Sequence, residues 1–149
     1  MLTKKTEDIA GYLKTAGLRV TSPRVAVLSA LQSLGPHQSV EQIADAVRTK
    51  LGSVTVQSVY DNLDALASAG LVRKIRPTGA PALYESRVGD NHHHVVCRAC
   101  GAVADVDCVV GQAPCLEPDA THGFEIDEAE VIFWGICPDC RNIKSTPLT

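Results

Sequence analysis

Two Cys-x-x-Cys pairs in the last third of the chain constrain its fold more than any other feature. Cys97 and Cys100 form the first pair, and Cys137 and Cys140 form the second. In such a pair a tight turn brings two thiolates to one metal ion, and two pairs complete the tetrahedral shell of zinc. The alternative is two independent dithiols. We predict a structural zinc site that serves folding, because four protein ligands leave no open coordination position.

The N-terminal residues and the apolar runs favour a soluble cytoplasmic protein. The start of the chain lacks the apolar stretch of an export signal, and the longest apolar runs fall well short of the roughly 20 residues that span a bilayer. In a cytoplasmic protein, the six cysteines of this chain are expected to bind metal or undergo redox chemistry rather than form structural disulfides. We expect no membrane partner.

Charge divides the chain of 149 residues into two unlike parts. Residues 1–90 contain eleven Lys and Arg against eight Asp and Glu, whereas residues 91–149 contain three against nine. Phosphate binding needs a local basic surface rather than a basic chain. The net charge of −3 therefore permits a DNA-binding module in the first part and an acidic module in the second.

The first part has the signals of four helices followed by a hairpin. Ser22 with Pro23 marks the beginning of the second helix, Ser39 with Gln42 forms a capping box for the third, and Thr55 opens the fourth. Two short strands are predicted at residues 71–75 and 82–85, with a turn rich in Pro and Gly between them. Helices that end in a helix-turn-helix pair and a β-hairpin predict a winged helix over residues 1–87.

After a predicted hinge at residues 88–91, the sequence changes to short β-branched runs. Strands are expected near residues 94–96, 102–106, 124–126 and 131–136, which predicts a small α/β domain over residues 92–149. The last run is unusually apolar. It is either a buried strand or one that pairs across a dimer interface, and the overall fold class is α+β.

A second group of possible metal ligands precedes the first cysteine pair. In an extended strand His92 and His94 lie on one face, and the carboxylates of Glu85 and Asp105 are near in sequence. Three consecutive histidines can also form an ordinary polar strand. His37, taken alone, fits a surface or capping histidine as well as a ligand.

Four features together resemble the ferric uptake regulator family. They are the segment LRVTSPR at residues 18–24, the segment SVYDNL at residues 58–63, the histidine strand and the two cysteine pairs. The resemblance covers roughly residues 8–141. It implies a homodimer whose winged helices bind palindromic double-stranded DNA, and a regulatory metal at the hinge that closes the dimer onto DNA. The hinge ligands implied by position are His37, Glu85, His92, His94 and Asp105.

Three imidazoles and two carboxylates suit Fe(II) or Mn(II) as the regulatory metal, and Zn(II) can occupy such a site in purified protein. Asp105, the segment at residues 87–94, and Cys108 with Cys115 resemble the peroxide-responsive branch of the family, which represses catalase-peroxidase genes. The resemblance thus implies a repressor that senses peroxide through bound Fe(II). Cys108 and Cys115 are either a reversible dithiol switch or two inert buried thiols.

Two other functions remain as alternatives. One is a repressor of the same family that senses iron or zinc supply. The other is a metalloenzyme that uses the His and Asp cluster. We expect no enzyme and no organic substrate, because the sequence has no evident nucleophile–base pair and no phosphate-binding glycine loop.

The fourth helix is the predicted recognition helix. By resemblance Tyr60 contacts DNA, and polar neighbours hydrogen-bond to bases or phosphates. Arg19 and Arg24 are expected to bind phosphates beside it and Lys74 and Arg76 to do so from the wing, although each can instead be a solvated surface charge. The complete set of predicted DNA contacts is Arg19, Arg24, Thr55, Gln57, Ser58, Tyr60, Lys74 and Arg76.

Overall fold

The chain folds into two compact units, Met1–Gly89 and Asp90–Thr149. The structure is a computed structural model that describes residues 2–86, 88, 90–108 and 116–145, with only the backbone for residues 2–7 and 143–145. The boundary between the units falls within residues 88–91. The action of these residues as a hinge stays a prediction.

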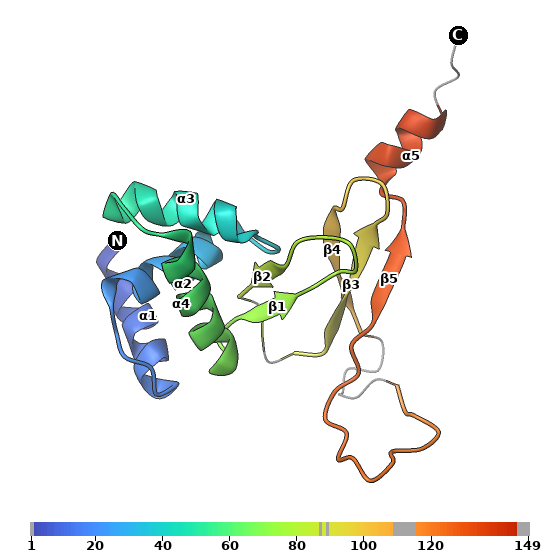
Figure 1. Cartoon of the computed structure of the whole chain (residues 1–149), viewed down its shortest axis with the longest axis horizontal. Coiled ribbons are helices and arrows are strands. Elements are labelled where there is room, and N and C mark those ends of the chain that lie inside the picture. The colour runs from blue at the N-terminus through green and yellow to red at the C-terminus, as the bar shows by residue number, and fades with distance from the viewer. Residues whose placement is uncertain (1, 87, 89, 109–115, 146–149) are drawn as a thin grey trace. The chain divides into compact units, whose positions relative to one another are not determined.

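The first unit is a winged helix (Figure 1). Its helices are α1 (Leu2–Thr15), α2 (Ser22–Leu34), α3 (Val40–Leu51) and α4 (Val56–Ser68), followed by the antiparallel strands β1 (Arg73–Ile75) and β2 (Leu83–Glu85). The predicted α+β fold class is confirmed.

Side-chain caps explain where these helices begin. The Ser39 hydroxyl accepts from the Gln42 backbone N–H, and the Gln42 side chain accepts from the Ser39 N–H, which completes the predicted capping box of α3. Thr55 caps α4 as expected. The cap of α2 is Thr21 rather than Ser22, since the Thr21 side chain accepts from the backbone N–H of Arg24.

The apolar faces of the four helices meet in one core with the hairpin. Packing fixes α4 firmly, because Val59, Leu63 and Leu66 are all fully buried on its inner face. The outer face of the same helix is left to solvent. The buried members of this core are Ile9, Leu13, Ala26, Val27, Leu28, Ala30, Leu31, Val40, Ile43, Ala44, Val47, Val59, Leu63, Leu66, Val72 and Tyr84.

The second unit is a three-stranded sheet with one helix. Its strands are β3 (His92–Cys97), β4 (Val103–Asp107) and β5 (Ile132–Gly135), and α5 (Pro138–Ser145) follows β5. The sheet order is β4-β3-β5, with β3 antiparallel to β4 and parallel to β5 (Figure 1). No helix among the described residues is long and apolar enough to cross a membrane.

One of the strands expected in this unit is absent. Residues 124–126 form no strand, and Phe124 is 73% exposed. The helix α5 was not anticipated. The run at residues 131–136 contains the expected strand, β5, and it is an edge strand whose Phe133 and Trp134 are 50% and 37% exposed. It is therefore not buried within this chain, and pairing across a dimer interface stays a prediction.

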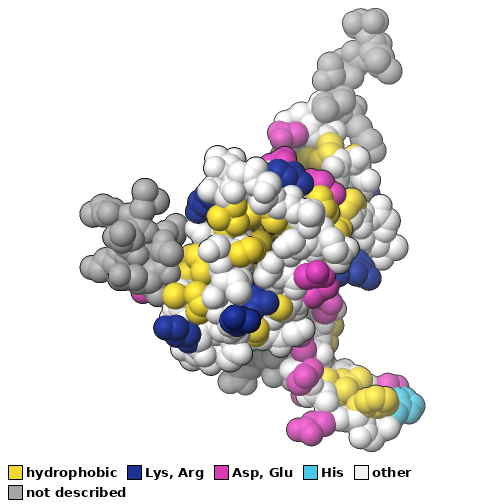
Figure 2. Space-filling view, turned by 60° about the vertical axis from the view of Figure 1, so that its left-hand side comes forward, with side chains coloured by type: hydrophobic (Ala, Val, Ile, Leu, Met, Phe, Trp, Pro, Cys, Tyr) yellow, Lys and Arg dark blue, Asp and Glu magenta, His cyan; other side chains and the backbone are white. Residues whose placement is uncertain are grey.

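The long connection before β5 is acidic and exposed. Among residues 116–130 only Ala129 is partly shielded from solvent. In Figure 2 its acidic side chains gather around apolar ones at the lower end of the view. A strand at residues 124–126 would need a hydrogen-bonding partner, and none of the described strands pairs with it.

Candidate metal centres and nucleic-acid interface

The four predicted zinc ligands lie together in the second unit. Parallel pairing of β3 with β5 places Cys97 opposite Gly135, so both strands end at the same edge of the sheet and both cysteine turns emerge there. The four Sγ atoms all lie within 4.8 Å of one another, and Cys100 Sγ is 3.7 Å from Cys137 Sγ. A regular tetrahedron with Zn–S bonds of ~2.3 Å has S···S edges of about 3.8 Å, so the cluster fits a zinc ion.

The thiols of this cluster differ in their readiness to ionise. Hydrogen bonds from the backbone N–H of Cys137, which lies 3.3 Å from Cys97 Sγ, and of Cys100 lower the pKa of Cys97 to about 6. Side-chain hydrogen bonding to Cys137, and then to Cys100, raises the pKa of Cys140 to about 12. Cys97 is therefore mostly a thiolate near neutral pH, whereas Cys140 stays protonated until a metal ion displaces its proton.

In the first unit, His37 and Glu85 form a buried pair. His37 Nε2 lies 3.3 Å from Glu85 Oε2, and their side chains are 8% and 0% exposed. Two backbone hydrogen bonds, Gln38 N–H to Tyr84 O at 2.9 Å and Tyr84 N–H to Gln38 O at 2.8 Å, bring the two segments together. Because His37 precedes Gln38 and Glu85 follows Tyr84, this bridge places the two side chains next to each other.

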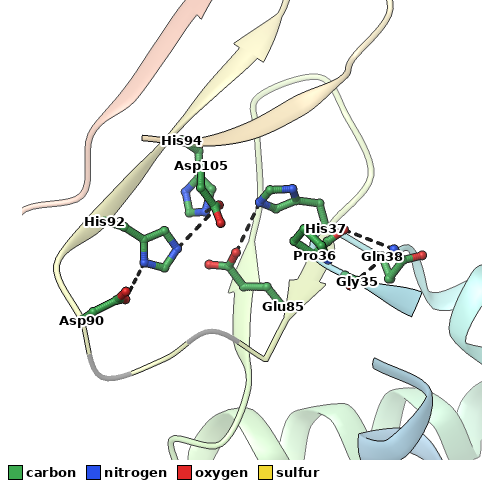
Figure 3. A network of polar contacts seen from close by, with 9 residues as sticks. All are labelled: Gly35, Pro36, His37, Gln38, Glu85, Asp90, His92, His94 and Asp105. Atoms are coloured by element: carbon green, nitrogen blue, oxygen red, sulfur yellow. Dashed lines mark hydrogen bonds and ion pairs between the residues drawn. The ribbon is translucent and has the colours of Figure 1, made fainter. Parts of the chain in front are cut away.

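Gln38, which the sequence analysis overlooked, also organises the turn that carries His37. Its Nε2 lies within 3.4 Å of three carbonyl oxygens in the turn after α2, as Figure 3 shows in part. His37 itself has φ of +62°, in the left-handed region that L-residues rarely occupy. The turn therefore holds His37 in a conformation of higher energy. The three oxygens belong to Leu34, Gly35 and Pro36.

In the second unit, His92, His94 and Asp105 converge on one face of the sheet. The register pairs His94 with Asp105, and His92 lies two residues from His94 on the same face. Asp105 Oδ1 is 3.4 Å from His94 Nε2 and 3.7 Å from His92 Nε2. Both imidazoles thus direct the same ring atom at one carboxylate oxygen, which is how side chains that share a cation are arranged.

A further carboxylate, also overlooked in the sequence, lies on the other side of the His92 ring. Asp90 Oδ1 is 2.6 Å from His92 Nδ1 (Figure 3). His93, between the two converging histidines, faces the opposite side of the strand and is buried.

The predicted DNA contacts divide into solvent-facing and inward-facing residues. Arg19, Gln57, Tyr60 and Arg76 are exposed, Ser58 and Lys74 are half-buried, and the Thr55 hydroxyl is engaged as the cap of α4. Lys74 Nζ lies 5.8 Å from the centre of the Tyr84 ring.

Arg24 is the inward-facing member of the set. Its Nε donates to Asn62 Oδ1 at 3.2 Å and its Nη1 donates to the Arg19 carbonyl oxygen at 3.0 Å. Asn62 in turn donates to the Ser58 carbonyl within α4. Arg24 therefore links α2 to the predicted recognition helix, a role that its sequence position did not reveal.

The two remaining cysteines are only partly described. Cys108 is half-buried, and its backbone N–H donates to the Asn91 carbonyl oxygen at 3.3 Å. Cys115 lies outside the described residues. The dithiol switch stays a prediction.

Comparison with known proteins identifies the family. Residues 15–134 match the ferric uptake regulator family. The chain is 62% identical over 133 residues to the transcriptional regulator FurA of Mycobacterium tuberculosis, covering 89% of this chain and 90% of the relative. It is 57% identical to ferric uptake regulation protein 2 of Mycolicibacterium fortuitum, covering 91% and 94%.

A solved structure agrees with these relatives. The ferric uptake regulator of Pseudomonas aeruginosa with manganese superimposes with a TM-score of 0.64 at 28% identity, covering 85% of this chain and 95% of that one. The expectation of a transcriptional regulator rather than an enzyme is confirmed by the family match. This chain belongs to the ferric uptake regulator family of metal-dependent transcriptional regulators.

Proposed function

We propose that this regulator is a homodimeric repressor that binds palindromic operator DNA when a regulatory metal is bound, and releases it after peroxide reacts with Fe(II) at that site. The single observation that carries the proposal is the presence of a buried imidazole–carboxylate set in each unit. His37 with Glu85 belongs to the first unit, and His92 and His94 with Asp105 belong to the second. A regulator of transcription of this kind acts in the cytoplasm.

We assign the two sets to one regulatory metal. Their donors are three imidazole nitrogens and two carboxylates, which suit Fe(II), Mn(II) or Zn(II). The carboxylate–imidazole distances of 3.3 to 3.7 Å exceed those of strong hydrogen bonds and leave room for a cation between the partners. The cysteine cluster supplies a separate structural zinc site.

The switch follows from ligands in both units. A cation that needs donors from both units binds most tightly to the conformation in which all of these donors can reach it. Metal binding therefore shifts the conformational equilibrium toward that state, to an extent set by the difference in metal affinity between the two states. Residues 88–91 act as the hinge in this proposal. When a ligand residue is lost, the metal no longer favours that conformation, and the protein returns to the equilibrium of its metal-free state.

Dimerisation is assigned to the second unit. The edge strand β5 exposes Phe133 and Trp134, and an exposed apolar edge strand is suited to pairing with a second chain. A twofold dimer matches a palindromic operator, since each winged helix then meets one half-site.

The DNA surface is assigned to the outer face of α4. Tyr60 and Gln57 lie exposed on it, beside Ser58 at the first turn. Arg19 and Arg76 supply phosphate contacts, and Lys74 supplies one from the wing. Arg24 holds α4 in position and does not itself bind a phosphate in this proposal, because its guanidinium is hydrogen-bonded within the unit.

Peroxide sensing rests on Asp105 in the ligand set and on the branch resemblance of residues 87–94. If Fe(II) were held by these ligands, it would supply the electron that reduces peroxide, and an imidazole beside it would be exposed to the resulting oxidant. His37, His92 and His94 hold the cation with their lone pairs, so an oxidised ring no longer binds it in the same way.

The test is fluorescence anisotropy of a palindromic duplex from the gene's own promoter. Anaerobic Fe(II)-loaded protein is measured before and after stoichiometric peroxide. Binding that collapses and is not restored by dithiothreitol supports oxidation of a ligand histidine. Recovery with dithiothreitol instead assigns the response to Cys108 and Cys115.

The second candidate is a repressor that senses metal supply. It is favoured by the similarity to ferric uptake regulation protein 2 of Mycolicibacterium fortuitum. In this case peroxide leaves the anisotropy of the Fe(II)-loaded complex unchanged, and a metal titration alone controls binding.

A further inference from the structure

Asp90 makes a short polar contact with His92, one of the assigned regulatory ligands. Its Oδ1 lies 2.6 Å from His92 Nδ1, whereas the distance from His37 to Glu85 and those from Asp105 to His92 and His94 are 3.3 to 3.7 Å. The His92 side chain is 1% exposed and that of Asp90 is 40% exposed. A buried ring nitrogen therefore meets a carboxylate that is partly in contact with water.

This contact decides which nitrogen of His92 is available to a cation. A neutral imidazole carries one proton, and the nitrogen without the proton is the one that binds metal. A proton on Nδ1 is donated to Asp90, which leaves the lone pair on Nε2. Nε2 is the atom that faces Asp105 Oδ1, at 3.7 Å, and the same oxygen lies 3.4 Å from His94 Nε2.

Asp90 itself is turned away from the point where these donors converge. Figure 3 shows Asp90 and Asp105 on opposite sides of the His92 ring, each joined to a different ring nitrogen. Asp90 thus touches the ligand rather than the place of the cation. This is the arrangement in which a carboxylate fixes the tautomer and the ring orientation of a histidine ligand.

We infer that Asp90 is a positioning residue for the regulatory metal, holding His92 as the Nδ1–H tautomer so that Nε2 binds the cation. The inference rests on the proposed function, because it needs a metal at His92. It assigns a role to the segment at residues 88–91 beyond that of a hinge. Loss of such a carboxylate lowers metal affinity roughly 10- to 100-fold in comparable sites.

The first test compares Co(II) affinity at the regulatory site in protein whose cysteine cluster is filled with zinc. Asp90→Ala should bind Co(II) roughly 10- to 100-fold more weakly than the unaltered chain. Asp90→Asn should fall between them, since its amide oxygen still accepts from Nδ1–H but carries no charge. Asp119→Ala removes an exposed acidic side chain elsewhere in the same unit, and it should leave the affinity unchanged.

The second test reads the proton itself. In the Co(II)-loaded protein, the His92 Nδ1–H should give a paramagnetically shifted, slowly exchanging proton signal, identified by its absence in His92→Ala. In Asp90→Ala this signal should exchange rapidly or disappear, while zinc content at the cysteines stays the same. A role of Asp90 in folding alone would not alter one ring proton in a protein that still binds both metals.

Each outcome has a defined meaning. Co(II) affinity in Asp90→Ala equal to that of the unaltered chain, or an unaltered His92 proton signal, overturns the inference. If Asp90→Ala does not fold, the affinity and the proton signal of Asp90→Asn decide. If the unaltered zinc-filled chain takes up no Co(II), the proposed regulatory site itself is wrong. That result differs from tight Co(II) binding that does not depend on Asp90, which contradicts only the inference about Asp90.

Discussion

Arg24, which the sequence predicts to bind a phosphate, is also hydrogen-bonded within its own unit. Its guanidinium donates to Asn62 in α4 and to the Arg19 carbonyl, and both bonds are lost in Arg24→Ala. We expect Arg24→Ala to lower the free energy of unfolding by about 1.5–3 kcal/mol, the range for hydrogen bonds to charged groups. Urea denaturation of the whole chain followed by circular dichroism measures it.

Arg76→Ala is the matched control for that variant. Arg76 is exposed on the wing, so its loss should leave the unfolding midpoint unchanged and reduce the salt slope of DNA binding by about one. The sequence analysis predicts a phosphate contact for Arg24, and such a contact would flatten the salt slope in Arg24→Ala as well. A slope flattened equally in Arg24→Ala, with unaltered stability, would restore Arg24 to the phosphate contacts.

His37 offers a test of strain at a proposed ligand. Its φ of +62° is unfavourable for any residue with a Cβ and free of penalty for glycine. We therefore expect His37→Gly to be more stable than His37→Ala by about 1 kcal/mol, although both lose the same ligand. Thermal unfolding of the two metal-free variants provides the comparison, and equal midpoints would show that the turn relaxes without cost.

Residue roles were predictable where they depend on local spacing. The common face of His92 and His94 follows from strand periodicity, and the cysteine pairs follow from their own sequence. The roles of Gln38 and Arg24 were not predictable, because they depend on side-chain directions and on a partner 38 residues away. Asp90 is two residues from His92, yet nothing in its spacing says which ring nitrogen it meets.

At the scale of elements, helix beginnings were the most predictable feature. The capping box of α3 depends on two residues three positions apart, so it is visible in the sequence. The N-cap of α2 is one residue earlier than predicted, because Thr21 and Ser22 both have suitable hydroxyls and only the geometry selects between them. Such competition between neighbouring caps cannot be settled from residue types.

Ser39→Ala tests the contribution of that capping box. Loss of the Ser39 hydroxyl leaves the Gln42 backbone N–H without its acceptor and should lower the free energy of unfolding by about 1 kcal/mol. Ser33→Ala, at an exposed position inside α2, is the control and should change stability little. An equal effect of the two substitutions, measured by urea denaturation, would contradict a special role of the cap.

Strands were less predictable than helices, for a physical reason. A strand is stable only when another strand satisfies its backbone, and that partner is distant in sequence. Residues 124–126 have the composition of a strand but none of the described strands pairs with them, whereas residues 131–136 contain β5 because β3 lies beside it. The short helix α5 was not predicted, because the segment that forms it was interpreted only as a metal-binding cysteine turn.

At the scale of the whole molecule, the two units differ greatly in their apolar cores. Among the residues of the first unit whose side chains the structure describes, sixteen form the buried cluster. Among the described residues of the second unit, the only buried hydrophobic side chains are those of Val96 and Cys97. A unit with so small a core needs another source of stability, and the cysteine cluster provides it by binding zinc.

The zinc affinity of this cluster should depend on pH in a defined direction. Cys140 has its pKa raised to about 12, so without metal it is protonated at neutral pH, and zinc must displace that proton. Cys97, with its pKa lowered to about 6, is mostly a thiolate at neutral pH and becomes protonated only in more acidic solution. Affinity should therefore fall as pH falls, and more steeply below about pH 6. Competition with a chromophoric chelator across this range measures the slope, and a flat profile would contradict the assignment of four thiolate ligands.

Zinc removal should destabilise the second unit and leave the stability of the first unit nearly unchanged. Cys140→Ser, or chelation of the metal, removes the main source of stability in the second unit, whereas the first unit retains its complete apolar core. Heating the zinc-free protein should then show the α-helical transition of the first unit nearly unchanged, while hydrogen exchange at β3, β4 and β5 becomes rapid. Cys108→Ser is the control, since Cys108 lies outside the four-cysteine cluster and its loss should leave both signals in place. Simultaneous loss of protection in α2, α3 and α4 would instead mean that the winged helix depends on the metal-bound unit for its own fold.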